Sequence, residues 1–313
     1  MNMTKSNTEI TENEECTVLH ITDENGQYTA TIYEVFSGVY FIYSDAHIQS
    51  VRFPERKTAS DNIFEISHCR EGRCECKIGG EFCYLTSGDT AIAHTNTISS
   101  SSYFPLRHYH GLTIRVDLDN TPDFSAYLDG LNIDLRGLST KLKSMNSGFV
   151  ARANSSFEHI FSELYAVPKQ IKTGYFKVKL LEVLLYLSVL EMQFDNRTFT
   201  KSQVDIVKEI SSYLMEHKDE HITLQQLSDH FHISVTHIKN TFKGVFGVSV
   251  GAYIRTQKME SAAYMLEYTN KTISEIASEH GYDNSSKFAA AFRDLKGVTP
   301  TEYRNNSSRL QQS

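Results

Sequence analysis

The sequence predicts an α+β protein, in which an N-terminal β-barrel or jelly-roll domain precedes a helical segment and a C-terminal all-α domain. Three observations support this class. Short alternating apolar segments fill residues 16–117, an apolar stretch of helical length follows at residues 172–193, and one helical pattern occurs twice within residues 223–304. With 313 residues and 40% hydrophobic side chains, the chain can bury more than one core.

The two ends of the chain are polar. Residues 1–15 are acidic and hold no apolar run, so we expect a disordered N-terminus, no signal peptide and a cytoplasmic protein. Residues 307–313 are expected to form a flexible tail. The longest apolar stretch, Leu180–Leu190, is interrupted by Glu182 and is shorter than the roughly 20 residues that span a bilayer, so we expect no membrane segment.

Residues 16–120 are predicted to form the β domain. Segments such as Tyr28–Tyr33, Val39–Tyr43 and Leu112–Val116 are rich in β-branched and aromatic residues, and Gly, Asp or Asn separate them. Many short strands of this kind predict a sandwich or a barrel. The first 200 residues hold 18 basic and 25 acidic side chains, which accounts for the net charge of −7, so we do not expect this half to bind DNA.

Residues 121–195 are predicted to form a helical segment with helices at 155–166 and 172–193. The second helix is apolar on most of its circumference and therefore needs burial on more than one side. It is either an ordinary core helix or a dimerisation helix that packs on the β domain and on its copy in a second subunit. A polar linker is predicted at 196–203, followed by the C-terminal domain at 204–306.

The C-terminal domain contains the same pattern twice. Residues 223–254 align with residues 272–304 at an offset of 49, which becomes 50 after one extra residue near Tyr282–Asn284. Each copy begins at a threonine, Thr223 or Thr272, that can cap a helix. A tight turn and a second helix are predicted to follow in both copies.

The second helix of each copy has an apolar side and a polar side. Ile238 and Phe242 recur four apart, as do Phe288 and Phe292, so each pair faces inward and leaves the opposite face free. Residues 249–268 between the copies predict one long helix. Two heads that read one face of a duplex must lie about one helical turn, roughly 34 Å, apart, and a rigid helix can set that distance.

Spaced residues in both copies make up a recurring arrangement: Leu224-x-x-Leu227, Ile238-x-x-x-Phe242-Lys243, Ile273-x-x-Ile276-Ala277, Gly281-Tyr282, Phe288-x-x-x-Phe292-Arg293 and Gly297-x-x-Pro300-x-x-Tyr303-Arg304. This arrangement, from Ile222 to Arg304, resembles the DNA-binding domain of AraC/XylS-family transcriptional regulators. The resemblance covers about one quarter of the chain. It implies two recognition helices, near residues 235–245 and 285–295, that enter successive major grooves. It also implies promoter DNA, a second copy of the chain and RNA polymerase as partners, and no enzymatic activity.

The outward residues of the two predicted recognition helices are the candidate DNA contacts. The candidates for reading base edges are Val235, Thr236, His237, Lys239, Asn240, Ser285, Ser286, Lys287 and Ala290. The candidates for phosphate contacts are Lys243, Arg293 and Lys296.

The alternative is a helical packing domain whose second helices read nothing. The overall charge favours this alternative, because residues 201–313 hold 13 basic and 13 acidic side chains and are formally neutral. The positive charge is concentrated on the predicted recognition helices instead. We therefore expect modest, salt-sensitive DNA binding with few phosphate contacts.

The β domain carries a second resemblance. The segment Cys69–Thr90, with its Ser87-Gly88-Asp89 turn, is similar to the strand pairs of cupin-like jelly-roll sensor domains that precede this type of DNA-binding domain. This similarity implies a small-molecule effector inside the barrel and no cofactor. A fold analogy identifies neither the effector nor its pocket.

Cysteines and histidines of the β domain suggest a metal- or thiol-dependent sensor as the alternative function. Cys74 and Cys76 would share one face of a strand, as would His108 and His110, so a metal site is geometrically possible. Five cysteines in a cytosolic protein equally predict plain reduced thiols. A cupin-type metalloenzyme is the third possibility, but no glutamate follows the histidine pair at the usual short distance, and no catalytic residue is predicted.

Overall fold

The chain divides into two compact units, Met1–Thr200 and Lys201–Ser313, and each is described separately. The division falls inside the predicted linker. The computed structural model describes residues 7–310, apart from residues 25, 54–61, 79, 96–100, 122, 123, 125, 126, 129, 132, 145–147, 153, 154, 190–197, 218, 219 and 221.

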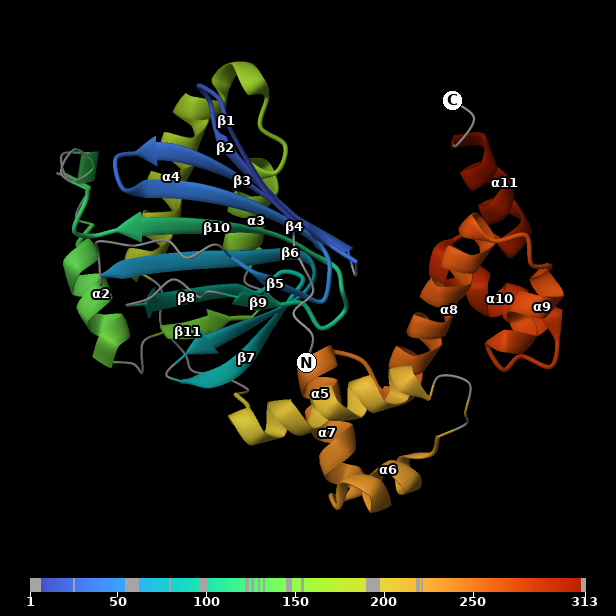
Figure 1. Cartoon of the computed structure of the whole chain (residues 1–313). Coiled ribbons are helices and arrows are strands. Elements are labelled where there is room, and N and C mark those ends of the chain that lie inside the picture. The colour runs from blue at the N-terminus through green and yellow to red at the C-terminus, as the bar shows by residue number, and fades with distance from the viewer. Residues whose placement is uncertain are drawn as a thin grey trace. The chain divides into compact units, whose positions relative to one another are not determined.

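The N-terminal unit is built on an antiparallel sheet of nine strands, together with a separate pair of short strands (Figure 1). In chain order the strands are β1 (Asn7–Glu12), β2 (Thr17–Asp23), β3 (Gly26–Phe36), β4 (Val39–His47), β5 (Ser50–Arg52), β6 (Ile63–Ile78), β7 (Glu81–Thr86), β8 (Thr90–Thr95), β9 (Ser101–Tyr103), β10 (Tyr109–Asp117) and β11 (Gly148–Ala151). The large sheet has the order β1-β2-β3-β4-β10-β6-β8-β11, and β5 pairs with β9.

Strand β6 is long enough to belong to two parts of this sheet. Its first half, from Ile63, pairs with β8 and β10, whereas its second half, from Arg73 to Ile78, forms a hairpin with β7. The predicted strands at residues 28–33, 39–43 and 112–116 are confirmed by β3, β4 and β10. A closed barrel is not confirmed, because no pairing between the outer strands β1 and β11 occurs among the described residues, and the sheet is open there.

The disorder expected for residues 1–15 was wrong for Asn7–Glu12, which form β1 and pair with β2 from Asn7↔Thr22 to Glu12↔Thr17. All six residues of β1 are exposed, so the strand has no apolar pattern that a sequence could reveal. Backbone hydrogen bonds to the edge of the sheet hold it instead.

Helices cover one face of the sheet (Figure 1). They are α2 (Leu135–Ser144), α3 (Ser155–Leu164), the short 3-10 helix η1 (Lys169–Ile171) and α4 (Lys172–Val189). Phe161 and Phe176 of these helices join Phe41 and Ile114 of the sheet in one buried cluster. The predicted helices at 155–166 and 172–193 are therefore confirmed, although residues 190–193 lie outside the described part of the chain. No helix in the described part of the chain is both long and apolar enough to cross a membrane.

A short backbone pairing ends the N-terminal unit. The Phe82 amide donates to the Phe199 carbonyl at 2.9 Å, and the Phe199 amide donates to the Phe82 carbonyl at 2.7 Å. The chain enters the first helix of the C-terminal unit only two residues later, at Lys201. Within the predicted linker, Phe199 therefore forms a single antiparallel bridge to Phe82 of β7.

The C-terminal unit is entirely helical. Its helices are α5 (Lys201–Glu216), α6 (Leu224–Phe231), α7 (Val235–Phe246), α8 (Val250–Tyr268), α9 (Ile273–Glu279), α10 (Ser285–Lys296) and α11 (Pro300–Leu310). The helix pairs α6–α7 and α9–α10 are the two copies of the sequence repeat, and α8 is the predicted long helix between them (Figure 1). Helix α11 includes residues 307–310, which contradicts a flexible tail there, while residues 311–313 lie outside the described residues.

The predicted helix caps are present in both copies. The Thr223 hydroxyl accepts from the Gln226 amide, and the Thr272 hydroxyl accepts from the Glu275 amide, each at 3.2 Å within a capping box. Ser234 caps α7 through the His237 amide. These caps fix where the helices of each pair begin, so the repeat in sequence becomes a repeat in space.

The turn inside each pair requires a left-handed backbone at one position. His232 has φ +55° after α6, and Gly281, which aligns with it at the offset of 49, has φ +75° after α9. Helices α7 and α10 likewise end at glycines with nearly equal φ, Gly247 at +79° and Gly297 at +76°. Glycine adopts this conformation without the strain that a Cβ atom causes, so it suits these helix ends.

An aromatic cluster lies under the second helix of each pair. Phe242 and Phe246 of α7 stack at 4.4 Å, and Tyr253 of α8 lies 5.4 Å from Phe242. In the second copy Phe292 of α10 lies 5.5 Å from Tyr303 of α11, the residue that aligns with Tyr253. Each cluster fixes the rotation of its helix about the helix axis.

Substitution of Gly281 by alanine tests the turn of the second pair. Gly281→Ala should destabilise the α9–α10 region by about 1–2 kcal/mol, because a residue with a Cβ atom is strained at this φ. Gly251→Ala is the matched control, since Gly251 lies in α8 with open space around it and should gain about 0.5–1 kcal/mol. Native-state hydrogen exchange of the full chain would measure both. Equal effects at the two glycines would contradict the assignment of the turn.

Candidate nucleic-acid interface

Helix α7 presents a polar face opposite its buried aromatic side. Thr236, Lys239, Asn240 and Lys243 are exposed, and they recur at the three- and four-residue spacings of one helix face. Ile238 and Phe242, on the other side, are completely buried. No acidic residue occurs in α7, so its exposed face carries only neutral and positive side chains.

Helix α10 repeats this arrangement. Ser286, Lys287, Ala290 and Arg293 are exposed, while Phe288 and Phe292 are buried, together with the partly buried Ala291. At the offset of 50, the exposed residues Thr236, Asn240 and Lys243 of α7 correspond to Ser286, Ala290 and Arg293 of α10. We refer to Thr236, Asn240 and Lys243 as the α7 stripe, and to Ser286, Ala290 and Arg293 as the α10 stripe.

Three of the predicted base-reading residues are only half-exposed. Val235 and His237 lie in the first turn of α7, and Ser285 lies in the first turn of α10, where its hydroxyl is 3.4 Å from that of Ser274. On α7, the side chains of Thr236, Lys239 and Asn240 are therefore more exposed to solvent than those of Val235 and His237. The other predicted base-reading residues, Ser286, Lys287 and Ala290, are exposed as well.

One predicted phosphate contact has a partner inside the protein. The Lys296 ammonium lies 2.5 Å from a carboxylate oxygen of Glu260 on α8, and its side chain is only 21% exposed. A second ion pair between the same helices joins Arg255 and Asp294 at 3.0 Å. These pairs tie α10 to α8 and leave Lys243 and Arg293 as better phosphate candidates than Lys296.

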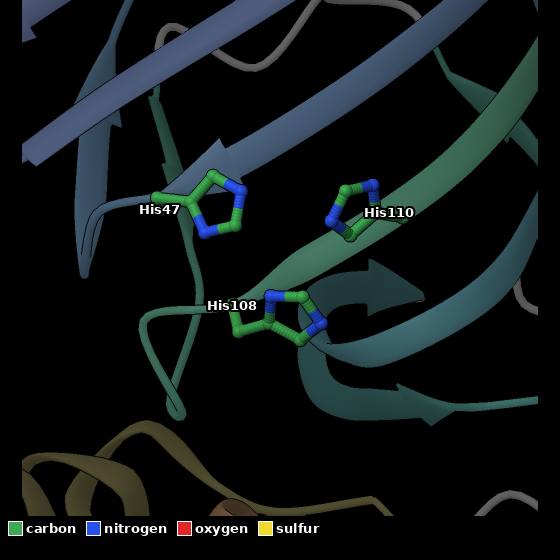
Figure 2. A group of neighbouring side chains, drawn as sticks. All are labelled: His47, His108 and His110. Carbon is green, nitrogen blue, oxygen red and sulfur yellow. The ribbon is translucent and has the colours of Figure 1, made fainter. Parts of the chain in front are cut away.

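The four metal candidates of the N-terminal unit do not come together. Cys76 lies beside Cys83 of the neighbouring strand, with 2.7 Å between the sulfur atoms, whereas His108 and His110 group with His47 (Figure 2). Within the described residues, this histidine group contains no cysteine. His47 carries no local sequence signal of such a site, because its position opposite His108 follows only from the pairing of β4 with β10.

The cysteines of β6 are in an environment that favours the thiol form. Burial raises the pKa of Cys74 well above that of an ordinary thiol. A hydrogen bond with Cys83, together with burial, does the same for Cys76. Because the thiolate is the reactive and metal-binding form, these cysteines are suited to packing rather than to chemistry.

Other histidines near the cysteines have structural partners. His68 is buried and stacks on Phe161 with 4.5 Å between ring centroids, and its ring nitrogens lie 3.2 Å from Tyr165 and Glu158. Burial lowers the pKa of His68 even though Glu158 acts in the opposite direction. This ring connects β6 to α3 within the core.

A cleft of about 610 Å³ lies at one end of the N-terminal sheet. Its lining combines polar and apolar side chains: Ser37, Leu118, Asp119, Asn120, Thr121, Leu128, Ile133, Asp134, Leu135 and Arg136. A smaller hollow of about 150 Å³ lies over His68 and Tyr165. Ligand sites in proteins have volumes of about 300–1,000 Å³, so the larger cleft is of suitable size.

The C-terminal unit resembles known helix-turn-helix proteins. Residues 227–306 match the family model described as helix-turn-helix domain. The transposon Tn10 TetD protein of Escherichia coli is 28% identical over 117 residues, which make up 37% of this chain and 83% of that protein. The C-terminal domain of AraT, a response regulator from Geobacillus stearothermophilus, is 30% identical, with a TM-score of 0.31, over 32% of this chain and 84% of that one.

Other relatives are much longer than the matched region. An uncharacterised helix-turn-helix transcriptional regulator of Staphylococcus aureus strain COL is 30% identical over 102 residues, and the chain spans only 14% of that protein's length. The similarity to these proteins therefore concerns the C-terminal unit.

The tandem helix pairs, their exposed stripes and the matched family model define the C-terminal unit as a DNA-binding domain of the helix-turn-helix class. Its family can be stated more closely. The domain is of the AraC type, and through it the chain is similar to AraC/XylS-family transcriptional regulators.

Proposed function

We propose that the protein is a sequence-specific DNA-binding transcription regulator controlled by a small-molecule effector that binds the N-terminal unit. One observation carries the DNA-reading part of the proposal. The α7 stripe and the α10 stripe lie at equivalent positions of two helices that each begin at a side-chain N-cap and end at a glycine. Both stripes are exposed, and the opposite side of each helix is buried in an aromatic cluster. Two such helices can enter successive major grooves of one duplex.

The side chains of the two stripes suit different parts of a DNA site. The amide of Asn240 can pair with an adenine edge through two hydrogen bonds, and the methyl group of Ala290 can contact a thymine methyl group. Lys243 and Arg293, one helical turn further along, are positioned for phosphates that flank the groove. The α10 stripe begins with small residues, which allow the helix to approach the bases closely.

The effector part of the proposal rests on the N-terminal unit. Its antiparallel sheet includes the Gly-Asp turn, in which Gly88 has φ +84° and the Asp89 carboxylate accepts from the amide and the hydroxyl of Thr86, both at 2.9 Å. The turn and the strand pairs around it support a cupin-like sensor domain. The 610 Å³ cleft lined by Asn120 and Asp134 is our candidate effector site. Binding there regulates DNA only if the effector prefers one arrangement of the protein over another.

Helix α4 is our candidate dimerisation surface. Val178, Leu185 and Val189 are 62%, 40% and 77% exposed, and their spacing of seven and four residues places them on one stripe of the helix. The opposite side of α4 is anchored by buried Phe176 and by the ammonium of Lys179, which contacts carboxylates of α3 and α4. A second copy of α4 would remove the outer stripe from water.

Selection from a random-sequence pool of duplex DNA tests the DNA-reading proposal. The full-length protein at moderate salt should enrich two short boxes whose centres lie about 10 base pairs apart. Sequencing of the bound pool would reveal them. Absence of enrichment by both the full chain and the 201–313 fragment would mean that the helix pairs form a scaffold.

Single substitutions in α7 separate base reading from phosphate contact. Asn240→Ala should weaken the preferred site by about 1–3 kcal/mol and relax the preference at one base pair, whereas Lys243→Ala should weaken all sequences alike and lower the salt dependence by about one charge. Binding titrations on matched and mismatched duplexes would distinguish the two effects. Lys296→Ala is the control, since Glu260 already holds this ammonium and a smaller loss is expected. An unchanged preferred site in Asn240→Ala would show that α7 is oriented differently.

Introduction of a charge on the outer stripe of α4 tests the dimer. Val178→Glu and Val189→Glu should each weaken self-association by at least about tenfold, or 1.4 kcal/mol, because each places a carboxylate in an apolar contact. Sedimentation of the full chain at several concentrations would measure it. Thr173→Glu, on an exposed part of α4 away from this stripe, is the matched control. Unchanged self-association in both valine variants would locate the dimer contact elsewhere.

A further inference from the structure

Three imidazoles from the end of β4 and the beginning of β10 meet on one face of the N-terminal sheet (Figure 2). His47 is the last residue of β4, His110 is the second residue of β10, and His108 lies just before that strand. Each offers one ring nitrogen, and the three nitrogens lie within 4.8 Å of one another. This group has no part in the proposed DNA contacts.

The strand register explains why the three rings converge. Tyr109 pairs with Ala46 and His110 with Asp45, so the antiparallel order places His108 opposite His47. Residues two apart on a strand share a face, which puts both histidines of β10 on the same side as His47. The ring centroids are accordingly 4.8–5.5 Å apart.

The backbone at His108 is held in place from the other side. Its carbonyl accepts from the Arg73 amide at 3.2 Å. Gly72, which has φ +80°, makes this approach possible, since a Cβ atom on it would lie only 2.0 Å from the His108 carbonyl oxygen. The segment that carries His108 and His110 is therefore fixed against both β4 and β6.

Two carboxylates support the rings. An oxygen of Asp45 lies 3.0 Å from Nε2 of His47 and 3.5 Å from Nε2 of His110, and an oxygen of Glu71 lies 3.6 Å from Nε2 of His108. Histidines that bind metal through one ring nitrogen usually donate from the other nitrogen to a carboxylate or a carbonyl, which fixes the ring. Asp45 and Glu71 lie at the Nε2 atoms, so they take that role when the metal binds Nδ1 of each ring.

The distances require only small side-chain movements for metal binding. Three nitrogens bound tetrahedrally at about 2.1 Å from zinc lie about 3.4 Å from one another. In this structure the three imidazole nitrogens lie within 4.8 Å of one another. His47 is exposed and the other two rings are half-exposed, so rotation about the side-chain bonds can close the difference.

We propose that His47, His108 and His110 bind one divalent transition-metal cation, with Zn²⁺ as the best-suited ion. Imidazole nitrogens select zinc and its neighbours in the transition series over Mg²⁺ and Ca²⁺, which prefer oxygen ligands. Three protein ligands on an open surface leave the fourth position to water, so the ion is exchangeable. The bound ion joins the end of β4 to the start of β10 and stabilises the N-terminal unit by mass action. The site does not depend on the proposed DNA-binding function.

The test is a Zn²⁺ titration of the full-length, tag-free chain after chelator has been removed by dialysis. Equilibrium dialysis should show one Zn²⁺ per chain, and the combined His108→Ala and His110→Ala substitutions should weaken binding at least about 100-fold. Asp45→Asn should weaken it about 10- to 100-fold, as is usual for a carboxylate behind a metal-binding histidine. His159→Ala is the matched control, because His159 is 71% exposed in α3 of the same unit and should leave binding unchanged.

Co²⁺ distinguishes the histidine site from the cysteines. Cobalt bound to the imidazoles should show a visible absorption without a thiolate-to-cobalt charge-transfer band, and Cys76→Ser should not alter it. A thiolate band, loss of binding in Cys76→Ser, or several weak sites that survive substitution of all three histidines would overturn the proposal. Zn²⁺ should also raise the thermal unfolding temperature of the wild-type chain but not of the double variant. Because the rings are at the surface, the variants retain the fold, and circular dichroism would verify this.

Discussion

Burial of one aromatic stripe on each of α7 and α10 is the constraint on which the candidate interface depends. Phe242 and Phe292 are completely buried, and they contact the equivalent tyrosines of the next helix, Tyr253 and Tyr303. Burial of such a ring stabilises the fold by roughly 1.5–3 kcal/mol. This is more than the net free energy of a hydrogen bond that one of the polar side chains on the opposite face could form. The apolar side thus selects which residues face outward, and the polar face follows from it.

Charge in the C-terminal unit is arranged locally rather than in excess. The unit is formally neutral, yet α7 lacks acidic residues, and Lys296 on α10 is neutralised by Glu260 on α8. If the two stripes bind DNA as proposed, few phosphate contacts carry the non-specific part of the affinity, and base contacts have a larger share of the total. A regulator of this kind discriminates among sites more by groove contacts than by overall attraction to DNA.

Features with a local cause were predictable from the sequence, and features with a long-range cause were not. The repeat, its threonine caps and the inward apolar pairs, Ile238–Phe242 and Phe288–Phe292, all follow from residues a few positions apart, and the structure contains them. Strand β1 was missed because its side chains are all exposed and only backbone pairing with β2 holds it. The contact of Lys296 with Glu260 and the position of His47 beside His108 join residues 36 and 61 positions apart, and no spacing rule indicates such pairs.

The last described residues of the N-terminal unit are held by its sheet. Phe199 exchanges two backbone hydrogen bonds with Phe82 of β7, and α5 begins at Lys201, so the last described residues before the DNA-binding domain belong to the sheet's backbone network. A loose linker would uncouple the two units, since a flexible chain transmits no preferred orientation. In the proposed regulator, a ligand of the N-terminal unit that prefers one geometry of β7 would also change the free energy of the Phe82–Phe199 pairing, because both belong to the same unit.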